Sequence, residues 1–200
     1  MSNKFRILTV CTGNICRSPL AEQLFLLEFQ GDDHFELDSA GTKVMVGHSM
    51  PENSLRIARR IGAYYPEQHR AKQLTGELID NADLILAMDR GHRKQVVELS
   101  PRSTRKVFSV RDFARLIEVT MPADLAAEVK LAGETSKAKL YAAIEAARLG
   151  RSDLPPLENP ADEDIVDPFG RSDQVYEDSA AQLIPAVQQI ASYLKSALEI

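Results

Sequence analysis

The sequence predicts an α/β fold, namely a four-stranded parallel sheet, doubly wound, with helices on both faces and an inserted pair of helices. Short apolar, strand-like runs alternate with stretches of helical periodicity along most of the 200 residues. Strands separated by helices imply a parallel sheet with right-handed crossovers. Apolar residues make up 44% of the chain and charged residues 26%, which are ordinary globular proportions that exclude disorder, collagen and coiled coil.

The first 119 residues supply the alternating elements. The chain opens with Phe5–Val10, a run rich in strand formers, and Ser18-Pro19 then begins a helix, because proline suits the first helical position and serine can cap it. The expected elements after these are a strand at 35–38, a helix at 51–61 closed by Gly62, a strand at 82–88, a helix at 90–99, a strand at 106–110 and a helix at 111–119.

The segment 121–156 differs in composition from the rest. It is rich in Ala, Glu, Lys and Leu, and its pattern predicts two helices, at about 123–131 and 136–149. It holds no Cys or His, so we expect an insertion that serves packing or partner contact within a single domain spanning 1–200.

The C-terminal part begins with an acidic stretch, Glu158–Asp178, of the kind that usually forms a solvated loop. A long final helix is expected over Asp173–Leu198. Pro185 lies inside it and predicts a kink or a break into two helices.

Charge and cysteine content exclude several classes of protein. A net charge of −5 argues against duplex nucleic acid as the main partner. No apolar run reaches the ~18 residues of a membrane span, and the N-terminus has no signal-peptide layout, so we expect a cytoplasmic protein. Two cysteines are too few for a disulfide scaffold, and with four scattered histidines they do not suggest a zinc site. Neither a metal nor a cofactor is expected.

Both cysteines lie in the loop Cys11–Ser18, between the first strand and the first helix. Ligands bind at the carboxyl ends of parallel strands, and a helix N-terminus attracts anions. The same field favours a nucleophilic thiolate at Cys11, and the planar guanidinium of Arg17 can hold two oxygens of a phosphate. Gly13 lets the backbone curl, Asn14 tolerates left-handed dihedral angles, and Ser18 can cap the helix or donate a hydrogen bond to the thiolate.

This loop resembles the phosphate-binding loop of the low-molecular-weight protein tyrosine phosphatases. The resemblance rests on Val10-Cys11-Thr12-Gly13-Asn14-Ile15-Cys16-Arg17-Ser18-Pro19, supported in family order by Asp38-Ser39-Ala40-Gly41-Thr42, Val46-Gly47, His69-Arg70-Ala71-Lys72-Gln73-Leu74, Ala82-Asp83-Leu84-Ile85-Leu86-Ala87-Met88-Asp89 and Asp167-Pro168-Phe169. It covers nearly the whole chain except the segment near 121–156, which looks like an addition of longer bacterial members.

The resemblance implies a two-step phosphoryl transfer without a cofactor. Cys11 attacks phosphorus to form a phosphocysteine, while Arg17 and the loop N–H groups of Thr12–Arg17 hold the phosphate oxygens. Asp167 resembles the general acid and base of the family, although the residues alone hardly distinguish it from its acidic neighbours. Asn14, Ser39 and His69 resemble residues that support the loop. The implied substrate is a phosphotyrosine protein, with a bacterial tyrosine kinase as a candidate partner.

Cys16 has two interpretations. The family offers a precedent for a redox partner that captures oxidised Cys11 as a reversible disulfide. The alternative is a buried thiol whose size suits the loop.

Three other functions compete with a tyrosine phosphatase. Protein arginine phosphatases of the same family resemble this loop but carry threonine in place of Ile15, while Phe169 resembles either branch. For either substrate, we expect Val44, Met45 and Phe169 to form the wall of the pocket beside the bound substrate, called here the substrate wall. Arsenate reductases need further cysteines downstream, and none follows Cys16. A phosphotyrosine-binding module without turnover would lack the nucleophile, the arginine or the acid, all of which are present. The oligomeric state is not predicted.

Overall fold

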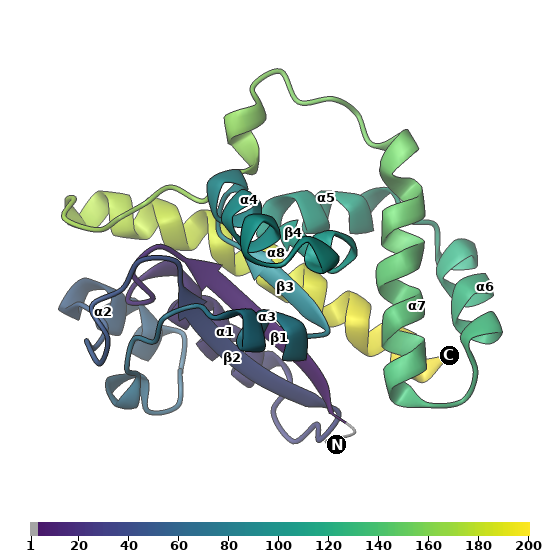
Figure 1. Ribbon diagram of the computed structural model, residues 1–200, viewed down its shortest axis with the longest axis horizontal. Helices are drawn as coiled ribbons and strands as arrows, with labels where there is room; N and C mark the ends of the chain where they lie inside the picture. The colour runs from purple at the N-terminus through teal and green to yellow at the C-terminus, as the bar shows by residue number, and fades with distance from the viewer. Residues whose placement is uncertain (1–3) are drawn as a thin grey trace.

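A computed structural model describes residues 4–200 and contains one four-stranded parallel sheet (Figure 1). Its strands are β1 (Phe5–Cys11), β2 (Phe35–Gly41), β3 (Leu84–Ala87) and β4 (Val107–Ser109). Their order is β2-β1-β3-β4, and every neighbouring pair is parallel, which confirms the predicted sheet. Because β2 and β3 lie on opposite sides of β1, a ligand-binding crevice is expected at the carboxyl end of β1.

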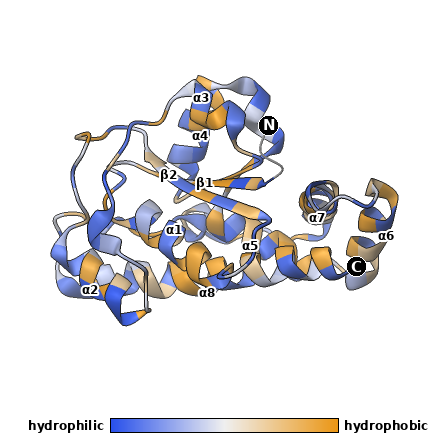
Figure 2. Ribbon diagram, turned by 90° about the horizontal axis from the view of Figure 1, so that it is seen from below, coloured by the Kyte–Doolittle hydropathy of each residue, from blue (hydrophilic) through white to orange (hydrophobic). Residues whose placement is uncertain are grey.

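Helices cover both faces of this sheet, as predicted (Figure 2). One face carries α1 (Arg17–Glu28), α5 (Val110–Val119) and α8 (Asp173–Glu199), and the other carries α3 (Gly76–Asn81) and α4 (Arg90–Leu99). The remaining α-helices are α2 (Glu52–Arg60), α6 (Pro122–Ala132) and α7 (Ser136–Leu149), and the 3₁₀ turns are η1 (Pro66–Gln68), η2 (Pro101–Arg105), η3 (Gly150–Asp153) and η4 (Pro160–Glu163).

The strand β1 lies between two apolar clusters. Phe5, Ile7 and Cys11 pack in the cluster with α1, α5 and α8, whereas Leu8 and Val10 pack in the cluster on the α3 and α4 side. Each fully buried side chain of this size stabilises the fold by about 1.5–3 kcal/mol. The central strand is therefore held from both faces, and the loop that follows Cys11 starts from a rigid support.

The helical pair α6 and α7 lies beside the sheet, away from α2 (Figure 1). Tyr141 of α7 donates a hydrogen bond to the Asp83 carboxylate, and its ring meets Phe5 edge-on, with centroids 5.6 Å apart. Lys137 Nζ lies 2.8 Å from Asp83 Oδ2. These contacts fasten α7 near the start of β1 and β3, at the opposite end of the sheet from the loop after Cys11.

Three elements differ from the sequence prediction. The helix α1 begins at Arg17, with Cys16 as its N-cap, so Ser18 lies inside the helix and does not cap it. The helix α3 was not predicted, because it spans only six residues and begins with glycine; Thr75 caps it by accepting a bond from the Leu78 N–H. The predicted break at Pro185 is wrong: α8 runs uninterrupted over 27 residues, and its apolar face buries Leu183 and other side chains against α1 and α5.

The acidic stretch is also more ordered than a solvated loop. Asp164 accepts bonds from the Arg90 guanidinium, at 2.9 Å from Nη2, and from the Arg90 backbone N–H. Arg115 Nη1 lies 3.5 Å from Glu163 Oε1. These pairs attach the stretch to α4 and α5 just before Asp167. The expectation about a signal peptide rests in part on residues 1–3, which lie outside the described residues.

Candidate active site

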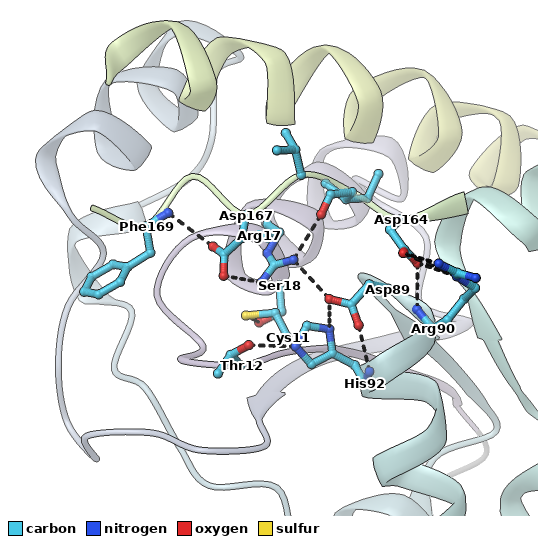
Figure 3. Close-up of polar contacts among 12 residues, drawn as sticks. Cys11, Thr12, Arg17, Ser18, Asp89, Arg90, His92, Asp164, Asp167 and Phe169 are labelled. Atoms are coloured by element: carbon cyan, nitrogen blue, oxygen red, sulfur yellow. Dashed lines mark hydrogen bonds and ion pairs between the residues drawn. The ribbon is translucent and has the colours of Figure 1, made fainter. Parts of the chain in front are cut away.

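The Cys11 sulfur lies at the carboxyl end of β1, buried beneath the loop that leads into α1 (Figure 3). The backbone N–H of Asn14 donates to Cys11 Sγ at 3.3 Å, and Ser18 Oγ lies 3.0 Å from the same sulfur. Ser18 Oγ also accepts a bond from Asn14 Nδ2, and the Ala40 carbonyl, 3.4 Å away, is a second acceptor for its hydrogen. The Asn14 N–H is thus a fixed hydrogen-bond donor to Cys11, and the Ser18 hydroxyl lies within hydrogen-bond distance of it.

Asn14 holds the loop in its curved shape. Its backbone has a φ of 52°, in the left-handed region that asparagine tolerates. Its side-chain N–H groups donate to Ser18 Oγ at 3.0 Å and to Ser39 Oγ at 2.8 Å, and its Oδ1 accepts from the Lys72 N–H at 2.9 Å. The His69 ring reaches its backbone carbonyl, with 2.6 Å between Nε2 and O. The predicted supports Ser39 and His69 thus both contact Asn14.

The protonation of His69 follows from this geometry. A carbonyl oxygen only accepts, so Nε2 carries the hydrogen. Burial lowers the pKa of His69 below its usual value, partly opposed by the bond to Asn14. The ring is therefore neutral at pH 7. Ser39 in turn donates to Glu22 Oε2 at 2.5 Å, and burial raises the pKa of that carboxyl.

Gly41 allows the end of β2 to press against the loop. A Cβ at this position would lie 2.4 Å from the carbonyl oxygen of Thr12 and 2.9 Å from the nitrogen of Asn14. The next residues continue the contact, since the Thr42 N–H donates to the Cys11 carbonyl at 2.9 Å and the Lys43 N–H to the Thr12 carbonyl at 3.0 Å. No side chain fits at Gly41 without displacing the loop.

Arg17 is buried, with only 4% of its surface exposed, and its guanidinium turns toward the C-terminal segment (Figure 3). Nη1 donates to the Ile165 carbonyl at 3.0 Å and lies 3.3 Å from Asp89 Oδ2, while Nη2 lies 2.9 Å from Asp167 Oδ2. A buried guanidinium held by a carbonyl and two carboxylates has a fixed orientation. The structure thus brings Cys11, Arg17 and Asp167 together from positions far apart in the chain.

A pocket of about 170 Å³ opens beside these residues. It is lined by the loop after β1, the segment after β2 and the segment before α8, namely Cys11, Thr12, Gly13, Ile15, Cys16, Arg17, Lys43, Met45, His48, Asp167 and Phe169. Met45 and Phe169 are mostly exposed, so they form the rim. Val44, expected in this wall, does not line the pocket, and its Cγ1 lies against Gly41 instead. Asn14 and Ser18 do not line the pocket, and their side chains hydrogen-bond to each other in the supporting network.

Cys16 lines the same pocket and is buried. Burial raises the pKa of its thiol to about 11, although hydrogen bonds with Ser54 and Tyr176 act in the opposite direction. The thiol is therefore protonated at neutral pH. Both cysteines are free.

Asp89 and His92 also contact the site, although neither is predicted from the sequence as a site residue. Asp89 caps α4 through a bond from the His92 N–H to its Oδ1, at 2.8 Å, and its Oδ2 contacts Arg17. His92 reaches Thr12, with 2.8 Å between Nε2 and Oγ1. One signal was present: the two residues directly follow β3, whose carboxyl end shares an edge with that of β1.

Neither a metal site nor a membrane span is found in residues 4–200. No group of three or more His, Cys, Asp or Glu side chains within that range is placed to hold a metal ion. No helix in the same range is both long and apolar enough to cross a bilayer.

Comparison with known proteins places the chain in a family. The sequence model of the family described as low molecular weight phosphotyrosine protein phosphatase matches residues 6–146. The probable low molecular weight protein-tyrosine-phosphatase EpsP of Ralstonia nicotianae is 38% identical over 102 residues, which are 51% of this chain and 68% of that protein.

Two solved structures are similar over nearly the whole chain. The tyrosine phosphatase AmsI of Erwinia amylovora has a TM-score of 0.63 at 26% identity, covering 94% of this chain and 91% of that one. The arginine phosphatase YwlE of Geobacillus stearothermophilus has a TM-score of 0.67 at 26% identity, covering 96% and 94%. The chain therefore belongs to the low molecular weight phosphotyrosine protein phosphatase family, whose members are hydrolases.

Proposed function

We propose that this enzyme removes phosphate from tyrosine residues of proteins through a phosphocysteine on Cys11. The observation that carries the proposal is the convergence of Cys11, Arg17 and Asp167 on one pocket at the carboxyl end of β1. A nucleophile, a bidentate cation and a carboxylate are the groups that a metal-independent phosphoryl transfer requires.

In the first step, the Cys11 sulfur attacks phosphorus. The S–P bond forms as the P–O bond to the tyrosine oxygen breaks, and Asp167 gives its proton to that oxygen. Arg17 and the N–H groups of Thr12–Arg17 hold the remaining phosphate oxygens, with Gly13 and Ile15 shaping the curve of the loop. An incoming phosphate competes with Asp167 for Arg17, so substrate binding frees this carboxyl for the leaving oxygen.

In the second step, water attacks the phosphocysteine. Asp167 takes a proton from the water, the S–P bond breaks, and inorganic phosphate leaves with Cys11 restored as a thiolate. Two sets of contacts support this role of Asp167: the pair of Arg90 and Asp164 anchors the segment before it, and the Phe169 N–H donates to Asp167 Oδ1 at 3.1 Å.

We expect the Asp167→Asn variant to lose activity by roughly a hundredfold to ten-thousandfold in kcat, which is the usual contribution of a general acid. The measurement is steady-state hydrolysis of a phosphotyrosine peptide across pH. The matched control is Asp162→Asn, an exposed acid of the same stretch, which should retain full activity. Equal losses in both variants would contradict the role of Asp167.

The shape of the pocket supports an aromatic phosphoester as the substrate. Ile15, Met45 and Phe169 line it with apolar surface, which suits a phenyl ring above the phosphate. The likeness to the arginine phosphatase YwlE supports phosphoarginine as the alternative substrate.

The residue at position 15 decides between these substrates in our proposal. We expect the wild type to prefer a phosphotyrosine peptide over a phosphoarginine peptide, and Ile15→Thr to shift the ratio of the two kcat/KM values toward phosphoarginine by about tenfold or more. The reason is that threonine replaces an apolar contact with a smaller, polar one. A wild type that prefers phosphoarginine would overturn the tyrosine assignment.

Cys16 is proposed as the partner that protects Cys11 from oxidation. Peroxide converts Cys11 to a sulfenic acid, and attack by the Cys16 thiolate on its sulfur then forms the S–S bond and breaks the S–O bond, releasing hydroxide that takes a proton from solvent. Because burial raises the pKa of Cys16 to about 11, we expect closure of the disulfide to accelerate as the pH rises from about 7 to 9. Mass spectrometry after peroxide treatment measures it. A Cys11 product that is only sulfinic or sulfonic would contradict this role.

The proposed partners are phosphotyrosine proteins, among them a bacterial tyrosine kinase. The proposed setting is the cytoplasm, because two free cysteines in the active-site loop suit a reducing compartment.

A further inference from the structure

Lys43 and His48 lie on the segment that follows β2, and both line the pocket, although neither has a part in the proposed reaction. Both side chains are exposed, and within residues 4–200 neither the Lys43 ammonium nor the His48 ring has a hydrogen-bond or ion-pair partner. A lysine ammonium only donates, and a histidine ring carries at least one N–H in either protonation state. The pocket therefore presents two donor groups that the described part of the chain leaves unused.

The backbone of the segment that carries these two residues is held at both ends. The Lys43 N–H donates to the Thr12 carbonyl at 3.0 Å, and the Ala71 N–H donates to the His48 carbonyl at 2.8 Å. Between them Gly47 makes a turn with a φ of 84°, and its N–H donates to the Ala71 carbonyl at 2.8 Å. Only side-chain freedom is therefore lost when a ligand meets Lys43 and His48, which lowers the cost of binding it.

The other charged groups in this part of the molecule already have partners. Asp167 is the single acidic side chain among the residues that line the pocket, and its Oδ2 lies 2.9 Å from Nη2 of Arg17. In the proposed reaction Asp167 carries a proton when the substrate binds, so the lining residues then include no ionised carboxylate. Lys72, on the segment beside the end of β2, is paired with Asp38. An anion that meets Lys43 must therefore come from the substrate.

We propose that Lys43 and His48 are specificity residues that bind the carboxylate of an acidic residue next to the phosphotyrosine of the substrate. With the phosphate in the loop after β1 and the ring against the apolar lining, the neighbouring residues of the substrate lie at the rim of the pocket. There Lys43 supplies a positive charge and His48 an N–H donor. The whole chain has a net charge of −5 and repels acidic peptides, so the preference comes from these local contacts.

The inference rests on the proposed phosphatase function and names the class of peptide that the enzyme prefers. The first test measures kcat/KM for three phosphotyrosine peptides that differ only in the residues on either side of the phosphotyrosine, which are glutamate, glutamine or lysine. We expect the wild type to prefer the glutamate peptide over the lysine peptide by about fivefold or more, because an exposed ion pair contributes up to about that factor and the lysine peptide is repelled. Equal values for the three peptides overturn the proposal.

The second test changes the charge at position 43. Lys43→Met removes the charge and keeps an unbranched side chain, and we expect it to lower the ratio of the kcat/KM values for the glutamate and lysine peptides by about threefold or more. Lys43→Glu should reverse the preference. The matched control is Lys94→Met, which changes an exposed lysine of α4 outside the pocket and should keep the wild-type ratio. A ratio that Lys43→Met leaves unchanged overturns the proposal, even where both values fall, because a uniform loss reports phosphate binding or folding.

The third test compares His48→Leu with His48→Gln, because glutamine keeps an N–H donor and leucine does not. We expect His48→Leu to lower kcat/KM for the glutamate peptide by about twofold to tenfold, which is the usual contribution of one hydrogen bond. His48→Gln should stay within about twofold of the wild type. A His48→Leu variant that hydrolyses the glutamate peptide as well as the wild type does overturns the role of His48.

A binding measurement separates this inference from the proposed function. Calorimetry with the Cys11→Ser variant gives dissociation constants for the glutamate and lysine peptides without turnover, and we expect the glutamate peptide to bind more tightly by about fivefold or more. If the wild type hydrolyses no phosphotyrosine peptide, the proposed function fails, and these constants still decide the role of Lys43, since equal constants overturn it. If the wild type hydrolyses all three peptides equally well, the proposed function stands and only the present inference fails.

Discussion

Replacing Cys11 with serine is expected to lower kcat for a phosphotyrosine peptide by at least about a thousandfold, because removal of a nucleophile eliminates the covalent route. The hydroxyl of serine is a far weaker acid than a thiol, so the donors around position 11 do not ionise it at neutral pH. The Asn14 N–H and the Ser18 hydroxyl that contact the sulfur would instead surround a neutral oxygen.

The Cys11→Ser variant should still fold and bind phosphate. The smaller hydroxyl fits where the thiol lies, and the side-chain bonds of Asn14 do not involve the sulfur. We therefore expect a dissociation constant for inorganic phosphate within about tenfold of the wild type, measured by calorimetry. Hydrolysis at the wild-type rate by this variant would contradict the mechanism.

Replacing Arg17 with lysine is the second change with a very large expected effect. Lysine keeps the charge, but its ammonium group cannot present two parallel N–H bonds to a phosphate while also bonding to the Ile165 carbonyl and Asp89. We expect kcat/KM to fall by roughly a hundredfold to a thousandfold, since an oriented donor that stabilises the transition state contributes about this much.

The matched control is the same substitution at an exposed arginine outside the pocket. Arg56→Lys changes an exposed arginine whose Nη1 pairs with Asp173 at 3.0 Å, and surface pairs of this kind contribute little. Its kcat/KM should equal that of the wild type. If Arg17→Lys also keeps full activity, the guanidinium is not the phosphate clamp.

The phosphate loop could be predicted from the sequence because its chemistry is local. Cys11 and Arg17 lie within seven residues of each other, at a point where the pattern changes from strand to helix. The sheet could also be predicted, since strands buried on both faces read as apolar runs.

Contacts between residues that lie far apart in the sequence could not be predicted from local patterns. Asp89 and His92 contact the site because β3 lies beside β1, and the one signal for them, their place after β3, depends on that strand order. Asp167 is one of many acids in its stretch, so the sequence distinguishes it only through the family resemblance, and its 2.9 Å contact with Arg17 is visible only in the structure. Val44 is apolar, as a substrate wall requires, but its side chain lies against Gly41 and does not line the pocket.

Local rules also failed where tertiary packing outweighed them. Pro185 predicts a kink or a break because it cannot donate a backbone hydrogen bond, and of these the break is wrong. The apolar face of α8 nevertheless packs against α1 and α5 on both sides of that residue, and the helix continues. Ser18 has the properties of a cap, yet it is the second residue of α1, where its hydroxyl contacts Cys11.

The central claim is a phosphocysteine on Cys11, and the most direct test is rapid acid quenching followed by peptide mass spectrometry. The Asp167→Asn variant suits the experiment when the substrate is p-nitrophenyl phosphate, because p-nitrophenolate leaves without a general acid while loss of the base still slows the attack of water on the intermediate. We expect the Cys11 peptide of this variant to carry the added mass of one phosphoryl group, and the Cys11→Ser variant to carry none. Turnover by the wild type with no phosphorylated Cys11 peptide at any quench time would contradict the account.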